Sequence, residues 1–106
     1  MGYMRHEETG AGAIDIIIPT TGAWLLDEVR IHLQAASAAE NFTVQIDAAA
    51  GHQYDTILNV VAMSALVDAS YLPTRPRYGL AGDKIRIIYP NASTVEYGLT
   101  VIWRSA

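Results

Sequence analysis

The stretch KIRIIYPNASTVEYGLTVIWR, residues 84–104, indicates the fold class more clearly than any other part of the chain. Apolar side chains occupy every second position from Ile85 to Tyr89 and again from Val95 to Trp103. A period of two is typical of strands that bury one face and expose the other. Residues 90–94, PNAST, separate the two runs and are turn formers. We therefore expect an antiparallel hairpin with a loop of about five residues.

Three segments nearer the N-terminus show the same alternation. Residues 14–18 alternate isoleucine with Asp15 and end at Pro19, which cannot donate to a strand ladder. Residues 42–46 also alternate apolar with polar side chains. In residues 24–33 the expected inner face holds Leu25, Val29, Ile31 and Leu33, and the expected outer face holds Trp24, Glu28, Arg30 and His32.

Residues 54–71 fit two patterns. A stripe from Ile57 to Leu66 fits a helix, whereas Leu58, Val60 and Ala62 alternate as in a strand. The three valines of this segment are β-branched, and the other expected strands need partners, so strands are favoured.

The remaining segments are interpreted as connections. Residues 35–39 and 48–50 are rich in alanine but too short for stable helices. Residues 72–77, LPTRPR, contain two prolines and predict an extended loop outside the ladders.

Six to eight short strands joined by Gly, Pro and Asn turns predict an all-β fold, an antiparallel β-sandwich or jelly roll. One domain is expected over residues 13–106. Residues 1–12, which are charged and rich in glycine, are expected to form a flexible N-terminal arm.

Composition excludes several functional classes. The chain has 106 residues, 51% of them hydrophobic, and no cysteine, so disulfides, thiolate catalysis and cysteine-based zinc sites are excluded. With 11 acidic and 7 basic side chains, the net charge of -4 disfavours nucleic-acid binding. The apolar run 57–67 is shorter than the roughly 20 residues of a membrane helix. We expect no membrane segment, no signal peptide and no cofactor.

Titratable residues suggest no catalytic or metal site. His6, His32 and His52 lie in separate segments, and their spacing is not that of metal ligands. The sequence also has no Gly-x-Ser-x-Gly motif, which would hold a nucleophilic serine in a strained turn. The chain is therefore expected not to be an enzyme.

Acidic residues have ordinary structural interpretations. Glu7–Glu8 and Asp27–Glu28 are adjacent pairs whose members should point to opposite faces of a strand. Asp83, in a Gly-Asp turn, is expected to accept backbone N–H groups.

Four residues are candidates for contact with a partner or another subunit: Trp24, Arg75, Arg77 and Tyr78. Trp24 shares the expected outer face with charged residues, so it should be exposed. The other three cluster in the proline-rich loop, and Arg and Tyr are enriched in interfaces. Gly98 falls on the outer face of its strand, where glycine usually marks a bulge or a close backbone approach.

The C-terminal third resembles a group of small jelly-roll virion proteins of tailed bacteriophages. The resemblance lies within residues 72–103, in GLAGDKIRI (79–87), Pro90–Asn91 and YGLTV (97–101). It implies a capsid decoration (cement) protein that binds and stabilises the shell as a homotrimer. Its partners would be copies of itself and the major capsid protein or other virion proteins. It would be located in the virion, after assembly in the host cytoplasm.

The high apolar content agrees with this expectation, because subunit contacts could cover hydrophobic residues that a thin sandwich leaves exposed. The N-terminal arm could then order on a neighbouring subunit. The alternative is a carbohydrate- or receptor-binding jelly-roll module of a tail, spike or neck component, with Trp24 or Tyr78 contacting the glycan.

Overall fold

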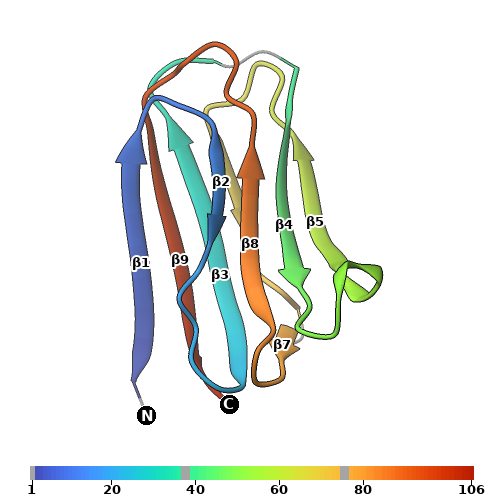
Figure 1. Cartoon of the computed structure of the whole chain (residues 1–106). Helices are drawn as coiled ribbons and strands as arrows, with labels where there is room; N and C mark the ends of the chain where they lie inside the picture. The colour runs from blue at the N-terminus through green and yellow to red at the C-terminus, as the bar shows by residue number, and fades with distance from the viewer. Residues whose placement is uncertain (1, 37–38, 75–76) are drawn as a thin grey trace.

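The computed structural model describes residues 2–36, 39–74 and 77–106. Within these residues two antiparallel sheets pack face to face, which confirms the predicted all-β sandwich. The strands are β1 (Tyr3–Gly10), β2 (Ile14–Ile17), β3 (Trp24–Leu33), β4 (Asn41–Asp47), β5 (Thr56–Ala62), β6 (Asp68–Tyr71), β7 (Arg77–Gly79), β8 (Lys84–Tyr89) and β9 (Tyr97–Ser105). A 3-10 turn, η1 (His52–Tyr54), precedes β5. The two termini lie at the same end of the sandwich (Figure 1).

The strand order is that of a jelly roll. Sheet A has the order β1-β9-β3-β6, with β7 also paired to β3, and sheet B has the order β2-β8-β4-β5. Along the chain, β1 pairs with β9, β2 with β8, β3 with β6 and β7, and β4 with β5. The chain is thus one long hairpin, rolled so that β3 also pairs with β9 and β4 with β8.

The predicted hairpin over residues 84–103 is wrong. Both of its strands exist, but β8 belongs to sheet B and β9 to sheet A, so residues 90–94 cross from one sheet to the other. Asn91 shapes this crossing: it adopts a φ of 49°, and its side-chain amide donates to the carbonyls of Gly12 and Val95. The alternation of apolar and polar residues cannot distinguish a hairpin within one sheet from a crossing between two sheets. Strands in either sheet turn an apolar face toward the same core.

A β-bulge in β3 reverses the expected faces at its start. The register between β3 and β9 shifts between Leu26 and Glu28, which leaves Asp27 as the extra residue. Trp24 and Leu26 therefore point inward with Val29 and are fully buried. The expectation that Trp24 is exposed is wrong for this reason, and Leu25 turns outward instead.

The N-terminal residues are part of the sandwich. All eight residues of β1 pair with β9 in a continuous register from Tyr3↔Arg104 to Gly10↔Tyr97. The expectation of a flexible arm over residues 1–12 is therefore corrected. Charge and glycine content suggested an arm, but β9 offers a full-length partner that sequence patterns do not reveal.

Residues 54–71, whose sequence fits both a helix and a strand, form two strands, β5 and β6, which confirms the preference for strands. In the next connection, residues 72–74 lie outside the strands as expected, whereas Arg75 lies outside the described residues. Arg77 instead begins β7, opposite Leu26 of β3, so its placement in a ladder-free loop is wrong.

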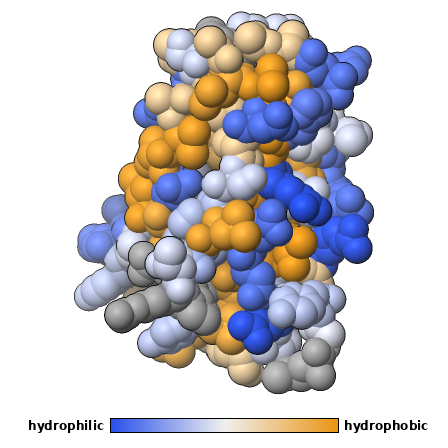
Figure 2. All heavy atoms as spheres, turned by 180° about the vertical axis from the view of Figure 1, so that it is seen from behind, coloured by the Kyte–Doolittle hydropathy of each residue, from blue (hydrophilic) through white to orange (hydrophobic). Residues whose placement is uncertain are grey.

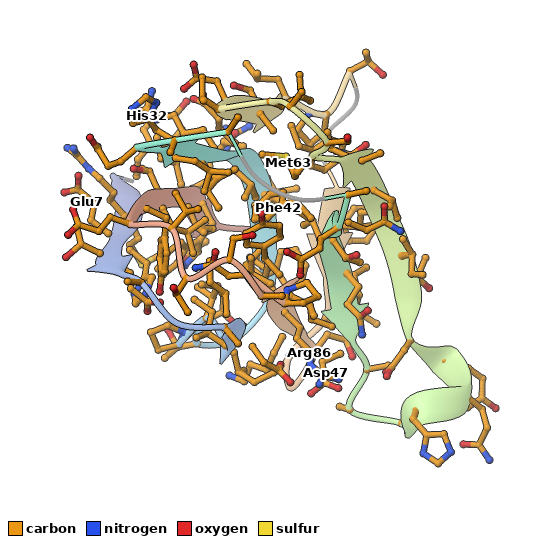
Figure 3. The ribbon with its side chains drawn as sticks, turned by 90° about the horizontal axis from the view of Figure 1, so that it is seen from above. Glu7, His32, Phe42, Asp47, Met63 and Arg86 are labelled. Carbon is orange, nitrogen blue, oxygen red and sulfur yellow. The ribbon has the colours of Figure 1, made fainter. Side chains whose placement is uncertain are left out.

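The core lies between the inner faces of the two sheets. Phe42 of β4 meets Tyr89 of β8 edge to face, with ring centroids 6.4 Å apart. Figure 3 shows Phe42 and Met63 pointing into this interior, while Glu7, Asp47 and Arg86 point away from it. Tyr97 and Trp103 of β9 are buried as predicted.

Candidate functional site

The structure places the candidate interface residues in different environments. Trp24 is buried, and its Nε1 donates to the carbonyl oxygen of Asp83 at 2.7 Å. Tyr78 is 63% exposed and pairs with Leu25 on the outer side of sheet A. The backbone of Arg77 lies beside it in β7. Trp24 thus belongs to the core of this end of the sandwich, and Tyr78 remains available to a partner.

The turn before β8 is built by Asp83. Its carboxylate accepts the N–H of Ala49 at 2.9 Å and that of Leu80 at 3.1 Å, which confirms the predicted role. Gly82 precedes it with a φ of 94°, a conformation that favours glycine. This turn ties the β4–β5 connection to the start of β8.

The outer face of sheet A carries several charged side chains. Arg104 lies 3.3 Å from Asp27 and stacks over the Tyr3 ring at 5.7 Å. Glu28 and Arg30 lie 3.7 Å apart on the same face. Asp27 and Glu28 therefore face the same way, contrary to expectation, because the bulge adds a residue between Leu26 and Glu28. Figure 2 shows hydrophilic residues on the β1 side of the molecule and hydrophobic residues toward the opposite edge.

A hollow of about 490 Å³ lies between β1 and β3 on this face. It is lined by Tyr3, Met4, Arg5, Asp27, Glu28, Arg30 and Ile102. An exposed tyrosine ring next to carboxylates and guanidinium groups is chemistry that can hold a polyhydroxylated ligand.

A second hollow, of about 510 Å³, opens over Gly98 at the other end of sheet A. The register runs through Gly98 without a shift on either side, and a Cβ there would meet nothing within 4 Å. The expected bulge or close approach is therefore wrong. The missing side chain instead leaves a depression between Thr9 and His32.

The histidines lie apart from one another. The Nδ1 of His32 lies 2.6 Å from Oδ1 of Asp68, and this pair links β3 to edge strand β6 at an exposed position. His6, expected in a mobile arm, lies in β1 with its Nε2 3.3 Å from Glu8. His52 lies exposed in η1. No group of three or more His, Cys, Asp or Glu in the described residues could hold a metal ion.

Glu8 also binds Tyr97, whose hydroxyl donates to Oε2 at 2.9 Å. Burial, and then the hydrogen bond to Glu8, raise the pKa of Tyr97 to about 12. Glu8, His6 and Tyr97 form a half-buried polar cluster on the inner side of β1.

The outer face of sheet B combines an ion pair with exposed apolar residues. Arg86 donates to both carboxylate oxygens of Asp15 at 2.8 Å and holds the pKa of Asp15 below its ordinary value. Three large aliphatic side chains share this face, Ile17 of β2 and Ile57 and Val60 of β5. We call these three residues the apolar face.

An apolar end adjoins this face beyond β4. Tyr54 and Leu80 are 66% and 67% exposed and border a hollow of about 450 Å³ over residues 48–50. The sequence did not predict that these residues and the apolar face are exposed. The available signals were consecutive apolar pairs such as Ile16–Ile17 and Ile57–Leu58, because one member of each must leave the core side of a strand.

A scan against protein-family models gave no match, and no curated protein sequence matched the chain. In the described residues, no helix is both long and apolar enough to cross a membrane.

Proposed function

We propose that this chain is a structural component of a tailed-phage virion, a capsid decoration protein that assembles as an oligomer on the shell. The observation that carries the proposal is the amount of apolar surface on a sandwich whose core is already filled. Ten large hydrophobic side chains are exposed among the described residues.

The arrangement of these side chains supports association rather than chance exposure. Ile57 and Val60 lie together on the outer side of β5, and Ile17 lies on the same side of the sheet in β2, with Arg86 of β8 and Gln45 of β4 between them. Tyr54 and Leu80 border a hollow at the end of the sandwich beyond β4. Exposed apolar side chains interspersed with polar groups are typical of protein–protein contacts. Beside Ile17, the Asp15–Arg86 pair offers hydrogen-bonding groups that can orient a partner.

The test is binding to gradient-purified phage particles. The wild-type protein should sediment with particles, and I57D/V60D should lose most of this binding because two carboxylates replace the apolar contact. S70D, on the outer face of sheet A, should bind like wild type. Equal binding by all three proteins would exclude the apolar face as the contact, and no sedimentation of the wild type would overturn the proposal.

The hollow beside Tyr3 favours a second candidate, a glycan-binding jelly-roll module. Tyr3 is 66% exposed at the rim, with Arg5 and Glu28 in the lining. In this case Y3A should abolish retention on a glycan column, and Y78A, outside the hollow lining, should not. Trp24 no longer belongs to this candidate because it is buried.

A further inference from the structure

The free edge of β1 differs from the other sheet edges. β1 is eight residues long and pairs with β9 without a register shift, while no strand among the described residues pairs with its other side. Edge strands β2 and β6 have four residues each, and β5 carries a register shift against β4. A long, regular edge presents a row of backbone N–H and C=O groups to another strand.

The usual devices that protect such an edge are weak here. β1 contains no proline, lysine or bulge. An inward-pointing charge can block edge pairing, and Glu8 lies on the inner side of β1. Its carboxylate is, however, bound by the Tyr97 hydroxyl at 2.9 Å and by His6 at 3.3 Å. Glu8 is thus held inside its own chain and leaves the edge open.

The outward side chains of β1 have a self-complementary charge pattern. Arg5 and Glu7 lie on the outer face, one on each side of His6, with side chains 59% and 65% exposed. If two such strands run antiparallel with His6 at the centre, each Arg5 lies opposite Glu7 of the other strand. Opposite charges that face each other across strands are stabilising.

We infer that β1 pairs antiparallel with β1 of a second copy of this chain, with the two His6 residues opposite each other. Shifting the register by two residues sets Arg5 against Arg5 or Glu7 against Glu7, and like charges directly opposite are destabilising. A shift by one residue would set the inner face of one strand against the outer face of the other. Charge and face together select a single register.

This contact joins sheet A of two copies into one continuous sheet. It adds about six to eight backbone hydrogen bonds over residues 3–9. The area is that of one strand, so the pairing should depend on concentration. An antiparallel edge contact closes on two copies, so a trimer would use another surface, and β1 would then join two trimers. The inference rests on the proposed function and names one of its subunit contacts.

Charge exchange tests the contact. R5E places two carboxylates on each strand, and E7R places two guanidinium groups, so each variant alone should lose the β1-dependent increase in mass. An equimolar mixture should regain it, because every acid then faces a base on the other chain. Light scattering from about 1 µM to about 1 mM covers weak protein contacts of this kind. Rescue by mixing cannot come from the Arg5–Glu7 contact within one chain.

A cysteine at position 6 gives an independent readout, since the chain has no cysteine of its own. Directly paired residues have Cα atoms about 4.5 to 5.5 Å apart, within disulfide range. H6C should therefore form covalent dimers under mild oxidation. M4C should not, because its counterpart lies four residues along, about 13 Å away.

The outcomes separate this contact from the proposed function. Unchanged masses for R5E and E7R, or equal cross-linking of H6C and M4C, would overturn the β1 contact. Retained particle binding by those same variants would leave the proposed function standing. Where H6C lowers the melting temperature, the charge-exchange mixture decides, because it leaves the inner face of β1 unchanged.

Discussion

Tyr97 of β9 donates its hydroxyl to Glu8 of β1 across 2.9 Å, and this hydrogen bond ties the edge strand to the centre of sheet A. The two residues are far apart in sequence and are diagonal neighbours across the two strands, since Gly10, two residues after Glu8, is the residue directly opposite Tyr97. Gly10 makes room for the ring, because a Cβ there would lie 3.0 Å from the phenolic oxygen. The N-terminal strand is thus fixed by a side-chain contact as well as by its ladder.

This contact predicts a loss of stability in alkali. Burial raises the pKa of Tyr97 to about 12, above the ordinary value of about 10 for the unfolded chain. The neutral phenol is therefore favoured by the fold, and its contribution is complete below pH 10 and is lost as the pH rises toward 12. Melting temperatures between pH 9 and about pH 12 should fall less steeply for Y97F than for wild type. Y54F, at an exposed position, should follow the wild-type slope, and equal slopes for all three proteins would contradict the assignment.

Gly79 should be intolerant of a side chain. A Cβ at this position would lie 2.4 Å from Cζ2 of the buried Trp24 ring. G79A should therefore lower the free energy of unfolding by about 1–3 kcal/mol through overpacking. G98A, where a Cβ meets open space, should change it by less than about 0.5 kcal/mol. Urea unfolding of G79A and G98A measures both changes. Equal losses of stability would show that Trp24 is not packed against Gly79.

Asp83 should stabilise the turn between β7 and β8. D83A leaves the N–H groups of Ala49 and Leu80 without their carboxylate acceptor. Because the site is partly open to water, the expected loss is about 1–2 kcal/mol. E96A, at an exposed position outside this turn, should change stability by less than about 0.5 kcal/mol in the same urea experiment. If D83A is as stable as E96A, the Asp83 carboxylate does not stabilise this turn.

Much of the fold could be predicted from residue patterns because burial on one face of a strand leaves a period of two. This applies to β2, β4, β8 and β9 and to the fold class. Strand partners could not be predicted in the same way. The alternation of Ile85 and Leu99 reports that each faces a core, but it contains no information about which sheet holds each strand.

The prediction that Trp24 is exposed was wrong for a local reason. One extra residue, Asp27, reverses the faces before it, and neither its charge nor its neighbours distinguish it from a regular strand residue. The free edge of β1 was missed because a strand with alternating charges, such as Arg5 to Glu8, has little apolar periodicity. Its strand character depends on pairing with β9.

Quantitative mass spectrometry of gradient-purified tailed-phage particles from the source culture tests the central proposal most directly. If the chain is a decoration protein, it should be present at a constant ratio to the major capsid protein through successive gradients. The purified chain should also rebind to particles from which it has been removed. Absence from the particles, together with a monomeric mass at every concentration in solution, would contradict the account.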